Sequence, residues 1–82
     1  MTELIEYHMR LSSVAAHQRA RVIRLLQDHL PHAHRLAALG VTPGTTVTVL
    51  QTFPGMIFQC DETELAIEPD VARLIVVEIL GT

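Results

Sequence analysis

The sequence predicts a mainly β fold: a small barrel of about five short strands, with one short helix after the first strand and a helical turn before the last. In the second half of the chain, apolar and polar residues alternate with a period of two over short runs that end in Pro-Gly or polar turns, which is typical of half-buried strands. The turns are too short to hold crossover helices, so the pattern disfavours a parallel sheet. Closing short strands into a barrel also removes exposed edges.

The first half supplies one strand and the helix. Residues 1–17 form a lead-in whose structure stays open between a short helix and an extended arm, and residues 18–82 form the single barrel domain. Within 18–26 we expect a strand with Ala20 and Val22 facing inward. Good helix formers then follow Pro31, which can open a helix, and Gly40 ends that helix as its C-terminal cap.

In the second half of the chain, strands are predicted where apolar residues recur at every second position and so face the core. A single helical turn is expected over residues 69–73, before the last strand. The residues expected to face the core of the barrel are Val47, Val49, Phe53, Met56, Phe58, Cys60, Leu65, Ile67, Ile75, Val77 and Ile79.

Composition excludes several classes of function. The 82 residues carry a net charge of −3 and no Lys, which argues against a nucleic-acid partner. Residues 42–82 hold six acids and one Arg, so a basic or neutral protein face is a better partner for that half. A single Cys allows no internal disulfide, and no apolar run approaches the 18 residues that a membrane span needs. We therefore expect a cytoplasmic protein without membrane insertion.

One stretch is similar to a known signature. Residues 35–50 read RLAALGVTPGTTVTVL, which resembles the RLxxLGLxPGxxVxVL signature of ferrous iron transport protein A (FeoA) domains. The residues of the tail that resemble the family are Leu65, Ala66, Ile67, Ala72, Ile75 and Val77. The resemblance extends over residues 11–80. It implies an SH3-like barrel that assists the membrane transporter FeoB in ferrous iron uptake by protein contact, and the same domain occurs at the C-terminus of iron-dependent repressors. Whether it activates or restrains its partner stays open.

The chain departs from the family pattern at three places. Ala16-His17 stand where the family usually has Pro-Gly. The PLGDP turn of the family is reduced to Pro54-Gly55, so that hairpin loop is shorter by about three residues. Glu68 replaces an Arg that follows the LAL sequence of the family. The hydrophobic spacing on both sides is kept, so the fold prediction stands.

The helix and its turn are the expected partner surface. A few central residues usually carry the binding energy of such a surface. Leu36 and Leu39 lie three apart, and an alternative is that they plug the open end of the barrel instead. The candidate partner-binding residues are His32, Arg35, Leu36, Ala38 and Leu39.

A second hypothesis is a metal-responsive regulatory domain. His29, His32 and His34 could bind a divalent transition metal weakly, since imidazole is a good ligand for Zn²⁺ or Fe²⁺. Their spacing fits no zinc motif, and on a continuous helix His34 would point about 140° away from His29. The alternative is three solvated histidines and no cofactor.

No constellation predicts catalysis. Cys60 lies in an alternating strand and is expected to be a core thiol. The acids near the turns are expected to be solvated, with a weak divalent-cation patch as the alternative; they are Asp61, Glu62, Glu64, Glu68 and Asp70. We expect a non-enzymatic protein that is a monomer or a weak dimer.

Overall fold

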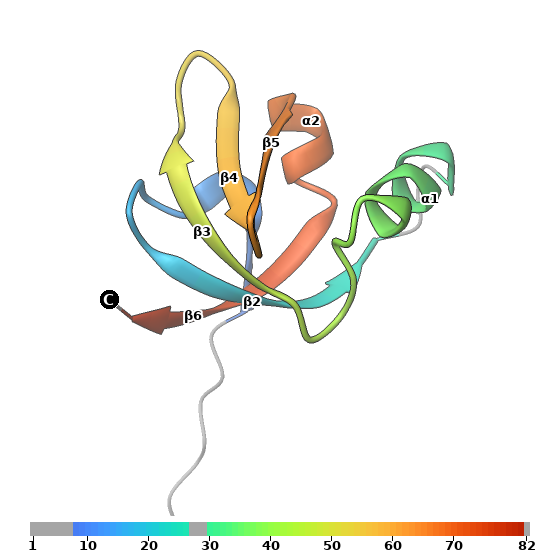
Figure 1. Ribbon diagram of the computed structural model, residues 1–82, viewed down its shortest axis with the longest axis horizontal. Coiled ribbons are helices and arrows are strands. Elements are labelled where there is room, and N and C mark those ends of the chain that lie inside the picture. The colour runs from blue at the N-terminus through green and yellow to red at the C-terminus, as the bar shows by residue number, and fades with distance from the viewer. Residues whose placement is uncertain (1–7, 27–29, 82) are drawn as a thin grey trace, which may run out of the picture.

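The computed structural model describes residues 8–26 and 30–81, which form one antiparallel sheet and three short helices (Figure 1). The six strands follow the order β1-β6-β2-β3-β4-β5, so β1 and β5 are the two edges. The elements are β1 (His8–Arg10), the 3₁₀ turn η1 (Leu11–Ser13), β2 (Arg19–Leu25), α1 (Leu30–Ala38), β3 (Thr46–Gln51), β4 (Met56–Cys60), β5 (Thr63–Ile67), α2 (Pro69–Ala72) and β6 (Ile75–Gly81).

Irregular pairing bends the sheet into a partly open barrel. The register between β2 and β6 shifts twice along β2, and the register between β3 and β4 shifts between Val49 and Gln51. Such bulges add a residue to one strand and increase its local bend and twist. The sheet therefore curls around its own inner face, as Figure 1 shows. Within the described part of the chain, no helix is both long and apolar enough to cross a membrane.

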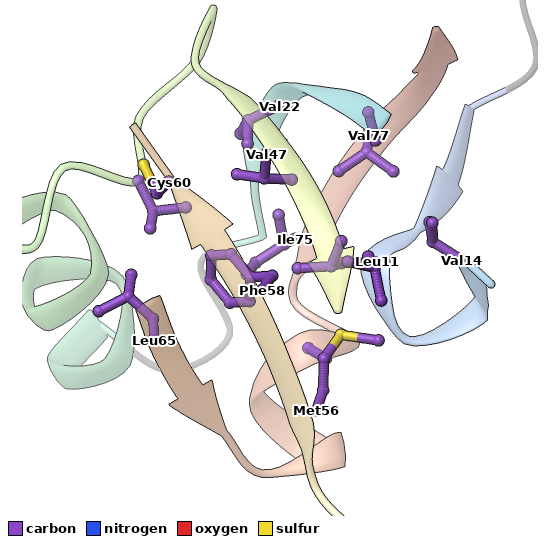
Figure 2. Packing of buried hydrophobic residues seen from close by; sticks show 14 of the residues in the cluster. Leu11, Val14, Val22, Val47, Met56, Phe58, Cys60, Leu65, Ile75 and Val77 are labelled. Carbon is purple, nitrogen blue, oxygen red and sulfur yellow. The ribbon is translucent and has the colours of Figure 1, made fainter. Parts of the chain in front are cut away.

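The inner face of the sheet holds an aliphatic core. Phe58 and Ile75 lie at its centre with no exposed surface, and Val22, Val47 and Val77 surround them (Figure 2). Among the described residues, no polar or charged side chain is buried. Apolar packing thus closes the interior of the barrel over the part of the chain that the structure describes.

The expected alternation is confirmed in most strands. Ala20 and Val22 are buried in β2, and β4 alternates buried and half-buried residues along its whole length. The expectation for Phe53 is wrong, because its side chain is 83% exposed. The bulge before Gln51 breaks the period of two, and β3 ends at Gln51, so Phe53 lies in the loop beyond the sheet.

The N-terminal part supplies more than the expected lead-in. Residues 8–10 pair with β6 as a sixth strand, and Leu11 and Val14 are buried in the core. Arg10 also donates a hydrogen bond from its guanidinium to the carbonyl oxygen of Arg73 at 2.9 Å. The described part of the lead-in is therefore packed against the barrel. Of the two alternatives for the lead-in, residues 8–10 are extended, residues 11–13 form a 3₁₀ turn, and residues 1–7 lie outside the described residues.

Candidate partner-binding groove

A groove of about 560 Å³ lies between the C-terminal half of α1 and the edge strand β5. The loop between β3 and β4 closes one end with Pro54 and Gly55, and the start of α2 contributes Pro69 and Val71. Most of the side chains that line it are apolar. The groove therefore suits an apolar group of a partner, which it would remove from water.

The helical wall is fixed by a capping motif at the end of α1. The backbone N–H of Val41 donates to the carbonyl of Leu36 at 2.9 Å, and that of Gly40 donates to Ala37 at 3.0 Å. Gly40 has a φ of 96°, which a glycine adopts without a steric penalty. This Schellman arrangement ends the helix and turns the chain back toward the core, where Val41 and Leu36 are both buried.

Leu36 in α1 and Leu39, which directly follows the helix, have different roles. Leu36 is 3% exposed and belongs to the core cluster, so it supports the groove from below. Leu39 is 45% exposed and lines the groove from the helical side. An exposed large apolar side chain at the mouth of an apolar groove is available to a partner.

The opposite wall is the edge of β5. Leu65 is buried and Ile67 is half-buried on the inner face of the sheet, whereas Ala66 is exposed on the outer face. All three nevertheless line the groove. Since successive side chains of a strand point to opposite faces, a groove that touches both faces must follow the backbone edge of the strand.

The charges around the groove are asymmetric. Arg35 lies on the helical wall and Glu68 on the opposite wall. Glu64 is exposed on β5 and adds a second carboxylate to this strand. Two ion pairs of the described residues lie away from the groove, between Arg21 and Glu78 and between Arg73 and Asp70. The strand side of the groove is therefore acidic and has carboxylates available to a partner.

The structure brings together some of the candidate residues proposed from sequence. Arg35, Leu36 and Leu39 lie side by side in the lining of the groove. Ala38 is exposed but does not line it. The side chain of His32 lies outside the described residues, so its place relative to the groove stays a prediction.

The three-histidine metal site also stays a prediction. His34 is exposed on α1, whereas His29 and the side chain of His32 lie outside the described residues. Within the parts of the chain that the structure describes, no three His, Cys, Asp or Glu side chains are grouped as a metal site requires, the turn acids included.

Cys60 is a core residue. Its side chain is 2% exposed, and burial together with the nearby charge of Asp61 raises the pKa of the Cys60 thiol above its ordinary value. Both effects keep the thiol protonated, which makes it a poor nucleophile and a poor metal ligand.

Sequence reasoning missed the wall that faces α1. Pro54, Gly55 and the residues of β5 were assigned only to turns and to the core. Their hydrophobic pattern gives no sign that β5 is an edge strand next to the helix, because sheet order depends on pairing between distant segments.

Three comparisons with known proteins bear on this architecture. A protein-family profile described as the FeoA domain matches residues 9–79, which confirms the resemblance expected from the signature. A search of curated proteins found no significant match.

Solved structures share the fold. A crystal structure of an iron uptake regulatory protein (FeoA) superposes with a TM-score of 0.82 at 26% identity, over 90% of this chain and 99% of that one. FeoA of Stenotrophomonas maltophilia, complexed with zinc, superposes with a TM-score of 0.78 at 27% identity, over 84% and 88% of the two chains. That protein is described as a prokaryotic SH3 domain protein and a candidate activating factor of ferrous iron transport.

A repressor gives the same fold in a larger protein. IdeR of T. acidophilum superposes with a TM-score of 0.83 at 23% identity, over 96% of this chain but 37% of the repressor. These neighbours confirm the SH3-like, mainly β architecture.

Proposed function

The chain belongs to the FeoA domain family, a family of non-enzymatic accessory or regulatory domains, and we propose that it is a cytoplasmic accessory protein of ferrous iron uptake. In this proposal it acts by binding the cytosolic part of the membrane transporter FeoB. Two structural neighbours support the link to iron, since one is described as an iron uptake regulatory protein and the other as a candidate activating factor of ferrous iron transport.

The observation that carries the proposal is the apolar groove between α1 and β5. The core of the described residues holds no polar side chain, so the chemistry left to this domain is that of its surface. On that surface the groove combines a concave apolar lining with the exposed Leu39. Both features are typical of a site that takes an apolar anchor from another protein.

Binding to the purified cytosolic domain of the matching FeoB tests the proposal. We expect saturable binding in a surface-based assay, with or without guanine nucleotide. Leu39→Glu places a charge in the groove and should weaken binding at least about tenfold, the cost of burying an uncompensated charge against apolar surface. Absence of binding by the unmodified chain under both nucleotide conditions would contradict the proposal.

Ala38→Glu is the matched control. It adds the same charge one residue earlier, at the last residue of α1, in an exposed position outside the groove lining. We expect it to bind FeoB nearly as well as the unmodified chain. If Ala38→Glu weakens binding and Leu39→Glu does not, the partner contacts the outer face of α1 instead of the groove.

A further inference from the structure

We propose that the groove takes its partner as an added β-strand: an extended segment that pairs with the free edge of β5 and alternates apolar with basic residues. This inference rests on the proposed function, because the groove is the same. The inference extends the proposed function by naming the backbone conformation and the side-chain pattern of the bound segment.

The edge of β5 has an unused row of backbone groups. β5 pairs with β4 over all five residues from Thr63 to Ile67, and no strand among the described residues pairs with its other side. In an antiparallel edge strand, alternate residues point their N–H and C=O groups away from the sheet. The groove runs along this edge, so a segment lying in it would meet these donors and acceptors.

The two faces of β5 specify the two kinds of side chain. Leu65 and Ile67 face inward and Glu64 faces outward, and Glu68 follows in extended conformation with a φ of −75° and a ψ of 153°. Side chains directly opposite each other on neighbouring strands interact in pairs. The added strand would therefore place apolar residues beside Leu65 and Ile67, against Leu39, and basic residues beside Glu64 and Glu68.

The same carboxylates disfavour a second copy of this chain as the occupant. A symmetric antiparallel pairing centred on Ala66 would set Glu64 of one copy opposite Glu68 of the other. Like charges directly opposite each other destabilise a pair of strands. β1, the other edge strand, is also a poor candidate to pair with β5 of a second copy. Met9 packs against its own core, and Arg10 donates a hydrogen bond to the carbonyl oxygen of Arg73. A foreign basic segment meets neither obstacle.

A synthetic ten-residue peptide of alternating Val and Arg, added to the full chain, tests the inference without FeoB. We expect binding with slowed amide exchange at alternate residues of β5, since a new hydrogen bond protects an N–H from solvent. N-methylation of the peptide at every second residue removes one row of its donors. One of the two possible N-methylated peptides should lose binding and the other should keep it.

Charge variants test the side-chain pattern. The double variant Glu64→Arg, Glu68→Arg should bind the Val-Arg peptide roughly 2- to 30-fold more weakly and should gain affinity for a Val-Glu peptide, from two cross-strand charge pairs. The control Glu62→Arg changes the charge of an exposed residue in the turn before β5 and should have little effect. If Glu62→Arg changes the binding free energy by about half as much as the double variant, the effect per charge is the same, recognition reduces to net charge and the inference is overturned.

The failures are distinguishable. Strand addition is overturned if the peptide does not bind up to millimolar concentration. It is also overturned if both N-methylated peptides bind as well as the unmodified one. Either result holds even if FeoB binds the chain. Self-association that the peptide does not reverse identifies a second copy as the occupant and also overturns it. Peptide binding with the expected parity, together with no binding to FeoB, supports the added strand and contradicts the proposed function alone.

Discussion

The thiol of Cys60 lies 3.6 Å from the carbonyl oxygen of Gly40 and donates a hydrogen bond to it. Cys60 ends β4, and Gly40 lies two residues after the end of α1, so this contact joins the sheet to the cap of the helix that forms one wall of the groove. The Thr45 hydroxyl donates to the same oxygen at 3.2 Å. The end of α1 is therefore anchored to the barrel from two elements.

The buried thiol predicts a loss of stability in alkaline solution. Burial raises the pKa of Cys60 in the folded state, whereas the unfolded thiol ionises near its ordinary pKa of about 8.5. Above that value the folded state holds a proton that the unfolded state has released. The free energy of unfolding should then fall as pH rises, by up to about 1.4 kcal/mol per unit, until the folded thiol ionises as well. Urea unfolding from pH 7 to 10.5 measures this.

Cys60→Ala is the control for the alkaline effect. It removes the titrating group, so its free energy of unfolding should start lower and stay flatter over the same range. The chain has no Lys, and the remaining groups that titrate there are the same in both proteins. Parallel pH profiles for the two proteins would show that the thiol does not cause the loss.

The two phenylalanines should differ sharply in what they contribute to stability. Phe58 has no exposed surface, and Phe58→Ala should cost about 3–5 kcal/mol through lost burial and the cavity left behind. A domain of this size has a total of roughly 4–12 kcal/mol, so the variant should be close to unfolded at 37 °C. Phe53 is 83% exposed, and Phe53→Ala should change the free energy of unfolding by less than about 0.5 kcal/mol. Thermal unfolding followed by circular dichroism compares them, and similar losses would contradict the packing described.

Gly40 should resist replacement because of its backbone conformation alone. A Cβ built at Gly40 meets nothing within 4 Å, but its φ is 96°, and an L residue there costs about 1–2 kcal/mol. Gly55→Ala is the matched control, because its Cβ would make an ordinary contact at 3.7 Å with the carbonyl oxygen of Ile67 and its φ is not positive. Urea midpoints should fall for Gly40→Ala and change little for Gly55→Ala. A midpoint for Gly40→Ala equal to that of the unmodified chain would exclude backbone strain at the cap.

Local patterns predicted the parts of the fold that local rules control. The period of two placed Val47, Val49 and Phe58 in the core, and the glycine signal placed the end of the helix at Gly40. The single missed inward residue, Phe53, follows a bulge, and the extra residue of a bulge cannot be read from alternation.

Features that depend on distant pairing were not predictable. The strand His8–Arg10 is too short to show a period, and it forms through pairing with β6 near the other end of the chain. The groove exists because β5 is left at an edge opposite α1. Arg35, Leu36 and Leu39 were candidates because they lie on the helix predicted from local sequence. The residues of the facing strand could be found only once the order of strands in the sheet was known.

The ion pair between Arg21 and Glu78 should stabilise the pairing of β2 with β6 slightly. The two residues are direct cross-strand partners, and the Arg21 Nε donates to Glu78 Oε1 at 3.1 Å. Because both side chains are partly exposed, a double-mutant cycle with Arg21→Ala and Glu78→Ala should give a coupling of about 0.2–1 kcal/mol, most of it lost in 1 M salt. A control cycle combines Arg24→Ala with Glu78→Ala. Arg24 is an exposed residue of β2 whose cross-strand partner is Val76, so the coupling in this cycle should be near zero. Equal coupling in the two cycles would mean that the charge of β2 as a whole, and not this pair, supports the strand.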